Sequence, residues 1–159
     1  MKINIFTLTE NAINLTLLWC LHGLFFINET VNDVQNELEI VQSQKAFLTI
    51  APTADELNMK LMDPLMDATK PGLLVQGSCA NVENVYVYFE QQRYDMTSIL
   101  GGIDQLLKIY CTLNIAYPKQ ACQFYEFLQN CFCNIPACES TNNSSSHIAA
   151  IIEQLTSSA

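Results

Sequence analysis

The sequence predicts an α+β fold in which a small antiparallel β-meander packs against an αα-hairpin and flanking short helices. Between residues 72 and 96 the apolar side chains alternate with a period of two, as in strands that bury one face. From Thr97 to Ile135 they recur instead at helical spacing on either side of a short turn. The chain has 159 residues, 50% of them hydrophobic and 14% charged, which is enough for one folded domain.

Three short strands form the predicted meander: Leu73–Val75, Val85–Phe89 and a brief Arg93–Met96. A Gly- and Ser-containing loop separates the first two, and Gln91-Gln92 turns the chain into the third. Alternate residues of the second strand form one apolar face. We therefore expect helices to cover one side of the meander.

The αα-hairpin has recognisable start and turn signals. Thr97 or Ser98 supplies the N-cap of its first helix. Asn114 suits the left-handed residue that ends this helix, and Pro118 suits the first position of the next. The expected apolar stripes are Ile99, Ile103, Leu106, Leu107 and Tyr110, followed by Ala121, Phe124, Tyr125, Leu128, Cys131, Phe132 and Ile135.

Two shorter helices are expected before the meander. The first follows Asn28-Glu29-Thr30, and its single apolar face suits a helix packed on the core or a short coiled-coil seam. Its heptad stripe consists of Val31, Val34, Leu38, Val41 and Leu48. The second begins at Thr53, whose spacing to Glu56 is that of a capping box, and ends or kinks at Pro64.

The chain divides into three regions by composition. Residues 1–27 form an apolar N-terminal segment, too short for a membrane span, that is either a buried helix or a cleaved leader. Residues 28–138 form the single α+β domain. Residues 139–159 form a polar linker and a short amphipathic C-terminal helix with Ile148, Ile151 and Ile152 on its apolar face.

Charge excludes several classes of partner. Sixteen acidic and seven basic residues give a formal net charge of -9, and no two basic residues are adjacent. Nucleic acids and anionic membrane surfaces attract clusters of Lys and Arg. We therefore expect no direct nucleic-acid binding and no attachment to an anionic membrane surface, and the short N-terminal apolar run predicts no membrane span.

The number of cysteines indicates whether the protein resides in a reducing or an oxidising compartment. The chain has seven: Cys20, Cys79, Cys111, Cys122, Cys131, Cys133 and Cys138. An odd number cannot pair completely within a monomer. Cys111, Cys122 and Cys131 fall among apolar helical positions, where we expect them to pack as small hydrophobes. This favours reduced thiols inside the cell. Secretion is the alternative, because cleavage near Ile27 leaves six cysteines, an even number.

Residues able to support chemistry are few. The candidates for a zinc site are Cys131, Cys133, Cys138 and His147, but the C-x-C-x4-C spacing has no matching second pair of ligands. We therefore predict no metal site and no cofactor. His22 and His147 are the two histidines, and neither lies in a catalytic motif. We expect no enzymatic activity.

Part of the chain resembles a known group of proteins. The residues concerned are Gly72–Gly77, Val85–Phe89, Ile103–Lys108, Tyr117-Pro118 and Phe124–Gln129. They resemble a loosely defined set of uncharacterised animal proteins, many of them associated with mobile elements or joined to zinc-finger or other nuclear domains. The resemblance implies a non-enzymatic, intracellular setting and no catalytic residue.

These observations predict a non-enzymatic protein–protein interaction or self-association module in the cytoplasm or nucleus. Its partner is expected to be a protein or a second copy of the chain. The expected interaction surface consists of two helix faces, Val34, Leu38, Val41 and Leu48, then Ile148, Ile151 and Ile152. Two alternatives remain: a small secreted cysteine-rich protein with a cleaved leader and disulfides, and a small zinc-stabilised domain.

Overall fold

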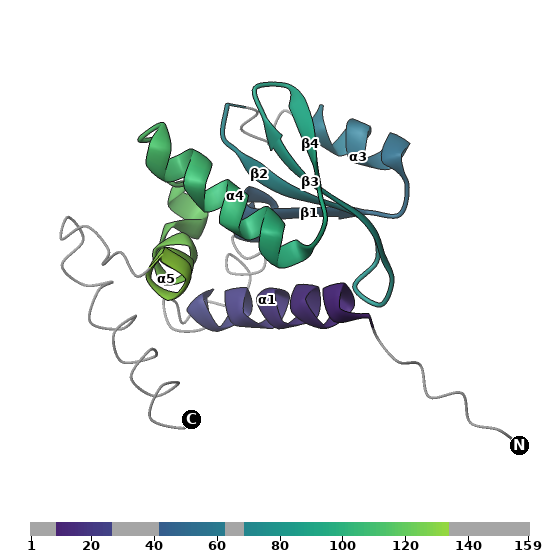
Figure 1. Ribbon diagram of the computed structural model, residues 1–159, viewed down its shortest axis with the longest axis horizontal. Coiled ribbons are helices and arrows are strands. Elements are labelled where there is room, and N and C mark those ends of the chain that lie inside the picture. The colour runs from purple at the N-terminus through teal and green to yellow at the C-terminus, as the bar shows by residue number, and fades with distance from the viewer. Residues whose placement is uncertain (1–8, 27–41, 63–68, 134–159) are drawn as a thin grey trace, which may run out of the picture.

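The computed structural model describes residues 9–26, 42–62 and 69–133, and its α+β class confirms the prediction. A four-stranded sheet has the order β1-β2-β3-β4. The strands are β1 (Leu48–Ala51), β2 (Gly72–Gly77), β3 (Val82–Phe89) and β4 (Gln92–Met96). The helices are α1 (Glu10–Phe26), α3 (Ala54–Leu61), α4 (Ile99–Thr112) and α5 (Cys122–Cys133), with the short 3-10 helix η1 (Lys119–Ala121) before α5 (Figure 1).

The sheet is mixed, since β2, β3 and β4 form the expected antiparallel meander and β1 adds a parallel strand beside β2. The prediction that Leu48 lies on a helical interaction stripe is wrong. The helical stretch 42–47 ends before it, and Leu48 is a strand residue only 2% exposed, paired with Leu73. A strand covered on both faces forms one continuous apolar run without alternation, so its sequence does not separate it from the preceding helix.

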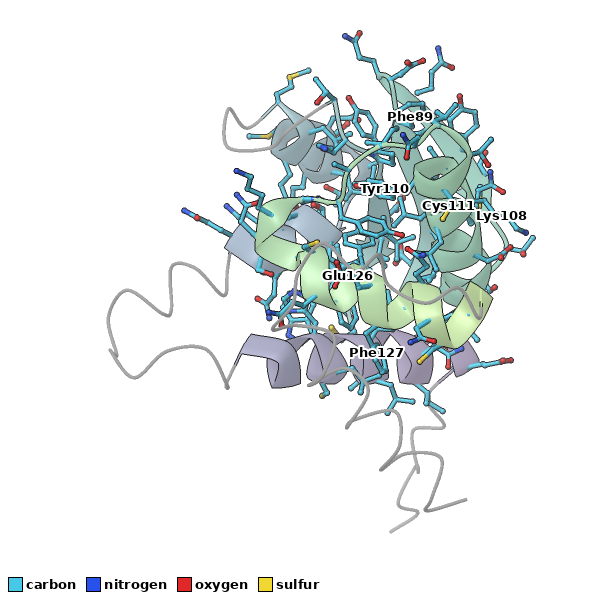
Figure 2. The ribbon with its side chains drawn as sticks, turned by 90° about the vertical axis from the view of Figure 1, so that its left-hand side faces the viewer. Phe89, Lys108, Tyr110, Cys111, Glu126 and Phe127 are labelled. Carbon is cyan, nitrogen blue, oxygen red and sulfur yellow. The ribbon has the colours of Figure 1, made fainter. Side chains whose placement is uncertain are left out.

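Helices cover both faces of the sheet. On one face Leu73, Val75, Val85 and Val87 pack with buried residues of α1, α4 and α5 in the main core. On the other, Leu57 of α3 contacts a smaller cluster made of Ala51, Leu74 and Tyr88. Figure 1 shows α4 crossing the sheet with α1 below it, and Figure 2 shows Phe127 between α5 and α1.

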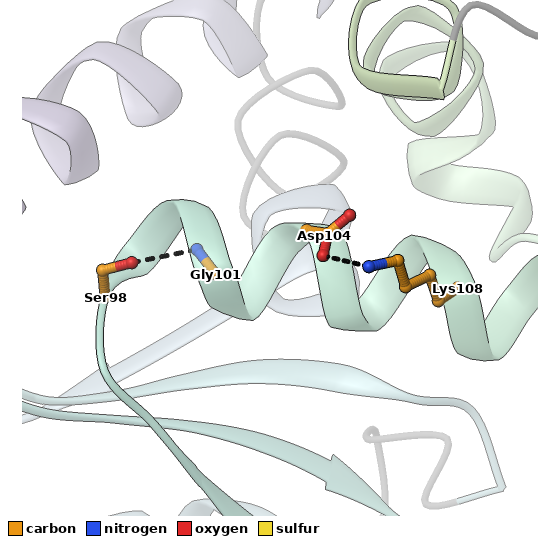
Figure 3. Close-up of polar contacts among 4 residues, drawn as sticks. All are labelled: Ser98, Gly101, Asp104 and Lys108. Atoms are coloured by element: carbon orange, nitrogen blue, oxygen red, sulfur yellow. Dashed lines mark hydrogen bonds and ion pairs between the residues drawn. The ribbon is translucent and has the colours of Figure 1, made fainter.

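The predicted N-cap of the αα-hairpin and its left-handed residue are confirmed, but the prediction that Pro118 is the first residue of the second helix is wrong. Pro118 has a ψ of 130° and precedes η1, and α5 begins only at Cys122. Ser98 is the N-cap of α4, and its hydroxyl oxygen accepts a 3.0 Å hydrogen bond from the Gly101 N–H (Figure 3). Asn114 has a φ of 50°, in the left-handed region. Gly102 allows α4 to approach the sheet closely, because a Cβ there would lie 2.6 Å from a methyl carbon of Leu73.

The apolar N-terminal segment contributes a helix to the main core. Ala12, Leu15 and Leu18 of α1 are buried, and the Asn11 side chain accepts a 3.1 Å hydrogen bond from the Ile99 N–H at the start of α4. The expected domain boundaries at residues 27/28 and 138/139, and the expected C-terminal helix, lie outside the described residues.

Candidate functional site

A pocket of about 530 Å³ lies between the sheet and the turn of the αα-hairpin. Its described lining residues belong to three stretches, 42–49, 70–74 and 116–120. The first two stretches lead into β1 and β2, whose parallel pairing brings their N-terminal ends to the same edge of the sheet. The third connects α4 to η1. The pocket therefore joins segments that are distant in the sequence.

Three lysines line this pocket: Lys45, Lys70 and Lys119. They are three of only seven basic residues in a chain of net charge -9, and none of the described lining residues is acidic. Lys45 and Lys119 are exposed, while Lys70 is half-buried. The Lys70 ammonium donates a hydrogen bond to the backbone carbonyl of Ala116, which links two walls of the pocket.

The remaining lining is largely apolar. Phe47, Leu73 and Leu74 are buried behind the lining, and Ala46, Ala116 and Tyr117 contribute the apolar surface that solvent reaches. Such a surface releases water when it receives an apolar group. The pocket thus combines cationic side chains that solvent reaches with an apolar lining, a mixture that suits an anionic ligand with an apolar part.

A cluster of stacked tyrosines holds the wall formed by residues 116–120. The Tyr117 ring stacks on Tyr125 with centroids 4.8 Å apart, and the Tyr117 hydroxyl lies 2.7 Å from the Gln129 side-chain oxygen. The Tyr110 ring packs against both tyrosines, and its hydroxyl donates a 2.8 Å hydrogen bond to the Pro71 carbonyl. The pocket is therefore supported by α4 and α5 together.

His22 and Ser43 support the pocket from inside the core. His22 Nε2 lies 2.9 Å from the Ser43 hydroxyl oxygen, and that hydroxyl donates its proton to the backbone carbonyl of Gln120. Since the hydroxyl has one proton, Nε2 acts as the donor to Ser43. This chain of contacts connects α1, the helical stretch 42–47 and the η1 wall.

The imidazole of His22 is neutral at pH 7. Burial lowers its pKa from 6.5 to about 4, and hydrogen bonding to the Ser43 backbone offsets part of the effect. The ring also packs between two aromatic rings, with centroids 6.1 Å from Phe47 and 5.0 Å from Phe124. His22 is 1% exposed and Ser43 fully buried, so this pair cannot reach a substrate.

The prediction that Cys111 and Cys131 pack in the interior is wrong, because both are exposed, and Cys122 is half-buried. Cys111 follows Tyr110, and a helix turns about 100° per residue, so the next side chain points away from the core. Cys131 lies in the last turn of α5, where Phe132 is also 45% exposed. In both helices the apolar stripe ends before the cysteine.

The other predicted site residues are distributed as follows. Within residues 9–26, 42–62 and 69–133, no group of three His, Cys, Asp or Glu side chains is placed to hold a metal ion. The Cys133 side chain lies outside the described part of the chain, as do Cys138 and His147. So do most residues of the expected interaction surface, namely Val34, Leu38, Val41, Ile148, Ile151 and Ile152.

Sequence reasoning missed the lysines of the pocket. Lys45, Lys70 and Lys119 lie far apart along the chain, each without a basic neighbour, and only the fold brings them to one cavity. No local signal separates them from the other basic residues, because Lys70 follows Asp67 by three residues and Lys2 lacks a nearby acid just as Lys45 and Lys119 do.

Comparison with protein-family models, curated proteins and solved structures gave no match to this chain. In the described residues, no helix has the length and hydropathy needed to cross a membrane. Any assignment of function therefore depends on the residues of the pocket themselves.

Proposed function

We propose that the protein is a non-enzymatic protein-interaction module and that a partner protein docks at the lysine-lined pocket. The observation that supports this most directly is the concentration of three of the seven basic residues in one cavity of an acidic chain. Opposite charge on a partner steers it to such a site and aligns it there. Self-association is the second form of the same proposal, with another copy as the partner.

The chemistry of the surroundings supports binding over catalysis. His22 and Ser43, the described pair that most resembles a base beside a nucleophile, are sealed in the core and hold the pocket wall. The pocket itself is lined by amines, amides, two hydroxyls and apolar groups. The described lining includes no histidine, carboxylate or thiol that could serve as a general base or a nucleophile.

We also propose an intracellular location. Cys20, Cys79, Cys111 and Cys131 are exposed and unpaired in the described part of the chain. Exposed thiols persist in the reducing cytoplasm or nucleus and become oxidised outside the cell.

Site-specific photocrosslinking tests the docking site. A benzophenone amino acid replaces either Gln120, which lines the pocket, or Gln105, an equally exposed glutamine on α4 that does not. In lysate of the native cells we expect an adduct from position 120 and little from position 105. Equal adducts at both positions, or none at 120, contradict the proposal. Mass spectrometry identifies a second copy of the chain if the module self-associates.

A further inference from the structure

We infer that the ligand of the pocket is a short acidic peptide segment with an apolar anchor side chain. This inference rests on the proposed function and specifies the partner surface. The segment places its carboxylates against the lysines at the edge of the pocket, chiefly Lys119, and its apolar side chain against the lining that solvent reaches, formed by Ala116 and Tyr117.

The charge distribution identifies the ligand as an anion. Lys45 and Lys119 approach the pocket from two different walls, the helical stretch 42–47 and η1. An anion that enters the pocket is attracted by the exposed Lys119, and the described lining includes no carboxylate that would repel it. Exposed acids elsewhere in the described chain, such as Asp55, Glu83 and Glu90, make those surfaces unfavourable for the same ligand, so electrostatics direct it to this pocket.

The type of cation alone does not separate carboxylates from phosphates. The described lining contains no arginine, the residue whose planar donors match either kind of oxyanion in pairs. Lysine ammoniums bind both kinds of anion as point charges, so competition with inorganic phosphate is one arm of the test below. A nucleic acid is disfavoured, because three lysines neutralise few phosphates and the net charge of -9 repels the rest.

The apolar lining and the size of the cavity favour a peptide over a small carboxylate ion. A volume of about 530 Å³ holds several side chains, and the buried residues at its base offer nothing to a hydrated ion. An apolar side chain adjacent to acidic residues satisfies both parts of the pocket. Lys70 is a positioning residue here, since its ammonium already binds the Ala116 carbonyl between the two walls.

Fluorescence anisotropy at 0.15 M salt tests the inference on the full chain. The labelled probe is the peptide Glu-Asp-Glu-Leu-Phe-Asp-Glu. Its matched controls replace every acid by the corresponding amide or replace Leu-Phe by Ser-Ser. We expect each control peptide to bind at least tenfold more weakly than the probe, because each lacks one of the two required features. A control peptide that binds as tightly as the probe overturns the inference.

Charge variants locate the binding. Lys119→Glu should weaken binding of the probe about tenfold, and the milder Lys119→Gln several-fold. Lys108→Glu is the matched control, since Lys108 is exposed on α4, outside the pocket lining, and pairs only with Asp104 there. It should change binding less than twofold. Equal losses in Lys119→Glu and Lys108→Glu indicate general attraction and overturn the inference. Circular dichroism confirms that each variant is folded.

A blocking variant tests the cavity without changing charge. Gly72 lines the pocket, and a Cβ there has no atom within 4 Å, so Gly72→Phe extends into open space. We expect it to abolish probe binding, while Gly72→Ala leaves most of it. Undiminished binding in Gly72→Phe contradicts the site.

The outcomes also separate this inference from the proposed function. If the probe does not bind but crosslinking at position 120 still captures a partner, the proposed interaction module is supported and the proposed acidic-peptide ligand is rejected. If inorganic phosphate at millimolar concentration displaces the probe while the amide peptide does not bind, the pocket is a phosphate site and the inference is overturned. If both the probe and the crosslink fail, both proposals fall.

Discussion

The hydroxyl of Tyr110 lies 2.8 Å from the backbone carbonyl oxygen of Pro71 and fixes the middle of the αα-hairpin to the residue before β2. Pro71 lines the pocket, and Tyr110 is 1% exposed. One buried hydrogen bond therefore joins a core residue of α4 to the rim of the candidate site.

Replacing Tyr110 by Phe should lower the free energy of unfolding by about 1.5 kcal/mol, because it leaves the buried Pro71 carbonyl without this donor. Urea denaturation followed by circular dichroism measures the change. Tyr94→Phe is the control, since Tyr94 is 46% exposed on β4 and should change stability by less than about 0.5 kcal/mol. Equal effects of the two substitutions contradict the role of the Tyr110 hydroxyl.

Two glycines of β2 should respond oppositely to the same substitution. Gly77 has a φ of +113°, and a Cβ there would lie 2.2 Å from the backbone oxygen of Asn81. Gly77→Ala therefore forces the β2–β3 loop to move and should cost about 2 kcal/mol or more. Gly72 has open space around its Cβ position, so Gly72→Ala should be neutral or stabilising.

Thermal unfolding of the two variants gives the comparison directly. A lowered melting temperature for Gly77→Ala beside an unchanged one for Gly72→Ala supports the strained turn. Equal melting temperatures for the two variants would contradict this, because they would show that an alanine can adopt the backbone conformation of position 77.

Local signals predicted those parts of the fold that neighbouring residues determine. The N-cap at Ser98 and the left-handed Asn114 could be identified because each acts on a backbone group a few positions away. Thr53 likewise accepts a hydrogen bond from the Glu56 N–H as the capping-box spacing predicts. β1 was missed because its conformation depends on pairing with Leu73 and Val75, more than twenty residues later.

The candidate site could not be predicted for the same reason. Lys45 and Lys119 come to line the same pocket only in the folded chain. There β1 lies beside β2, and the turn of the αα-hairpin lies over the N-terminal ends of these two strands. His22 gives a second example. It hydrogen-bonds to Ser43, which in turn donates to the Gln120 carbonyl, and both partners are remote from His22 in the sequence. Composition did predict the acidic background that makes these lysines distinctive.

The cysteines should differ in reactivity according to their surroundings. Burial raises the pKa of the Cys122 thiol to about 11, assisted by the charge of Glu126, to which the thiol donates a 3.5 Å hydrogen bond. Because the thiolate is the reactive form, alkylation of Cys122 by iodoacetamide at pH 8 should be at least tenfold slower than that of exposed Cys79.

Peptide mapping by mass spectrometry at successive times measures both rates. Glu126→Gln removes the neighbouring charge and should speed the reaction of Cys122 several-fold without changing that of Cys79. Equal rates in the native chain contradict the burial of Cys122. The same experiment on protein from the native cells tests location, since fully oxidised cysteines there exclude the intracellular proposal.

His22 should make stability depend on pH above the range where most carboxylates titrate. Its folded-state pKa of about 4 lies below the ordinary 6.5, so the unfolded chain takes up a proton at this residue before the folded chain does. Stability is unaffected by His22 above pH 6.5 and falls as the pH drops from there towards 4. Between pH 6.5 and 5 the expected loss is about 2 kcal/mol.

Urea denaturation at several pH values between 7.5 and 5 measures this slope. His22→Gln keeps a polar side chain but cannot be protonated, so its unfolding free energy should be lower at pH 7.5 and nearly level across the same range. NMR titration of the native protein gives a test that needs no variant. The His22 ring protons should keep their neutral chemical shifts down to about pH 5. A midpoint near 6.5 contradicts the buried, neutral imidazole that holds Ser43 against the pocket wall.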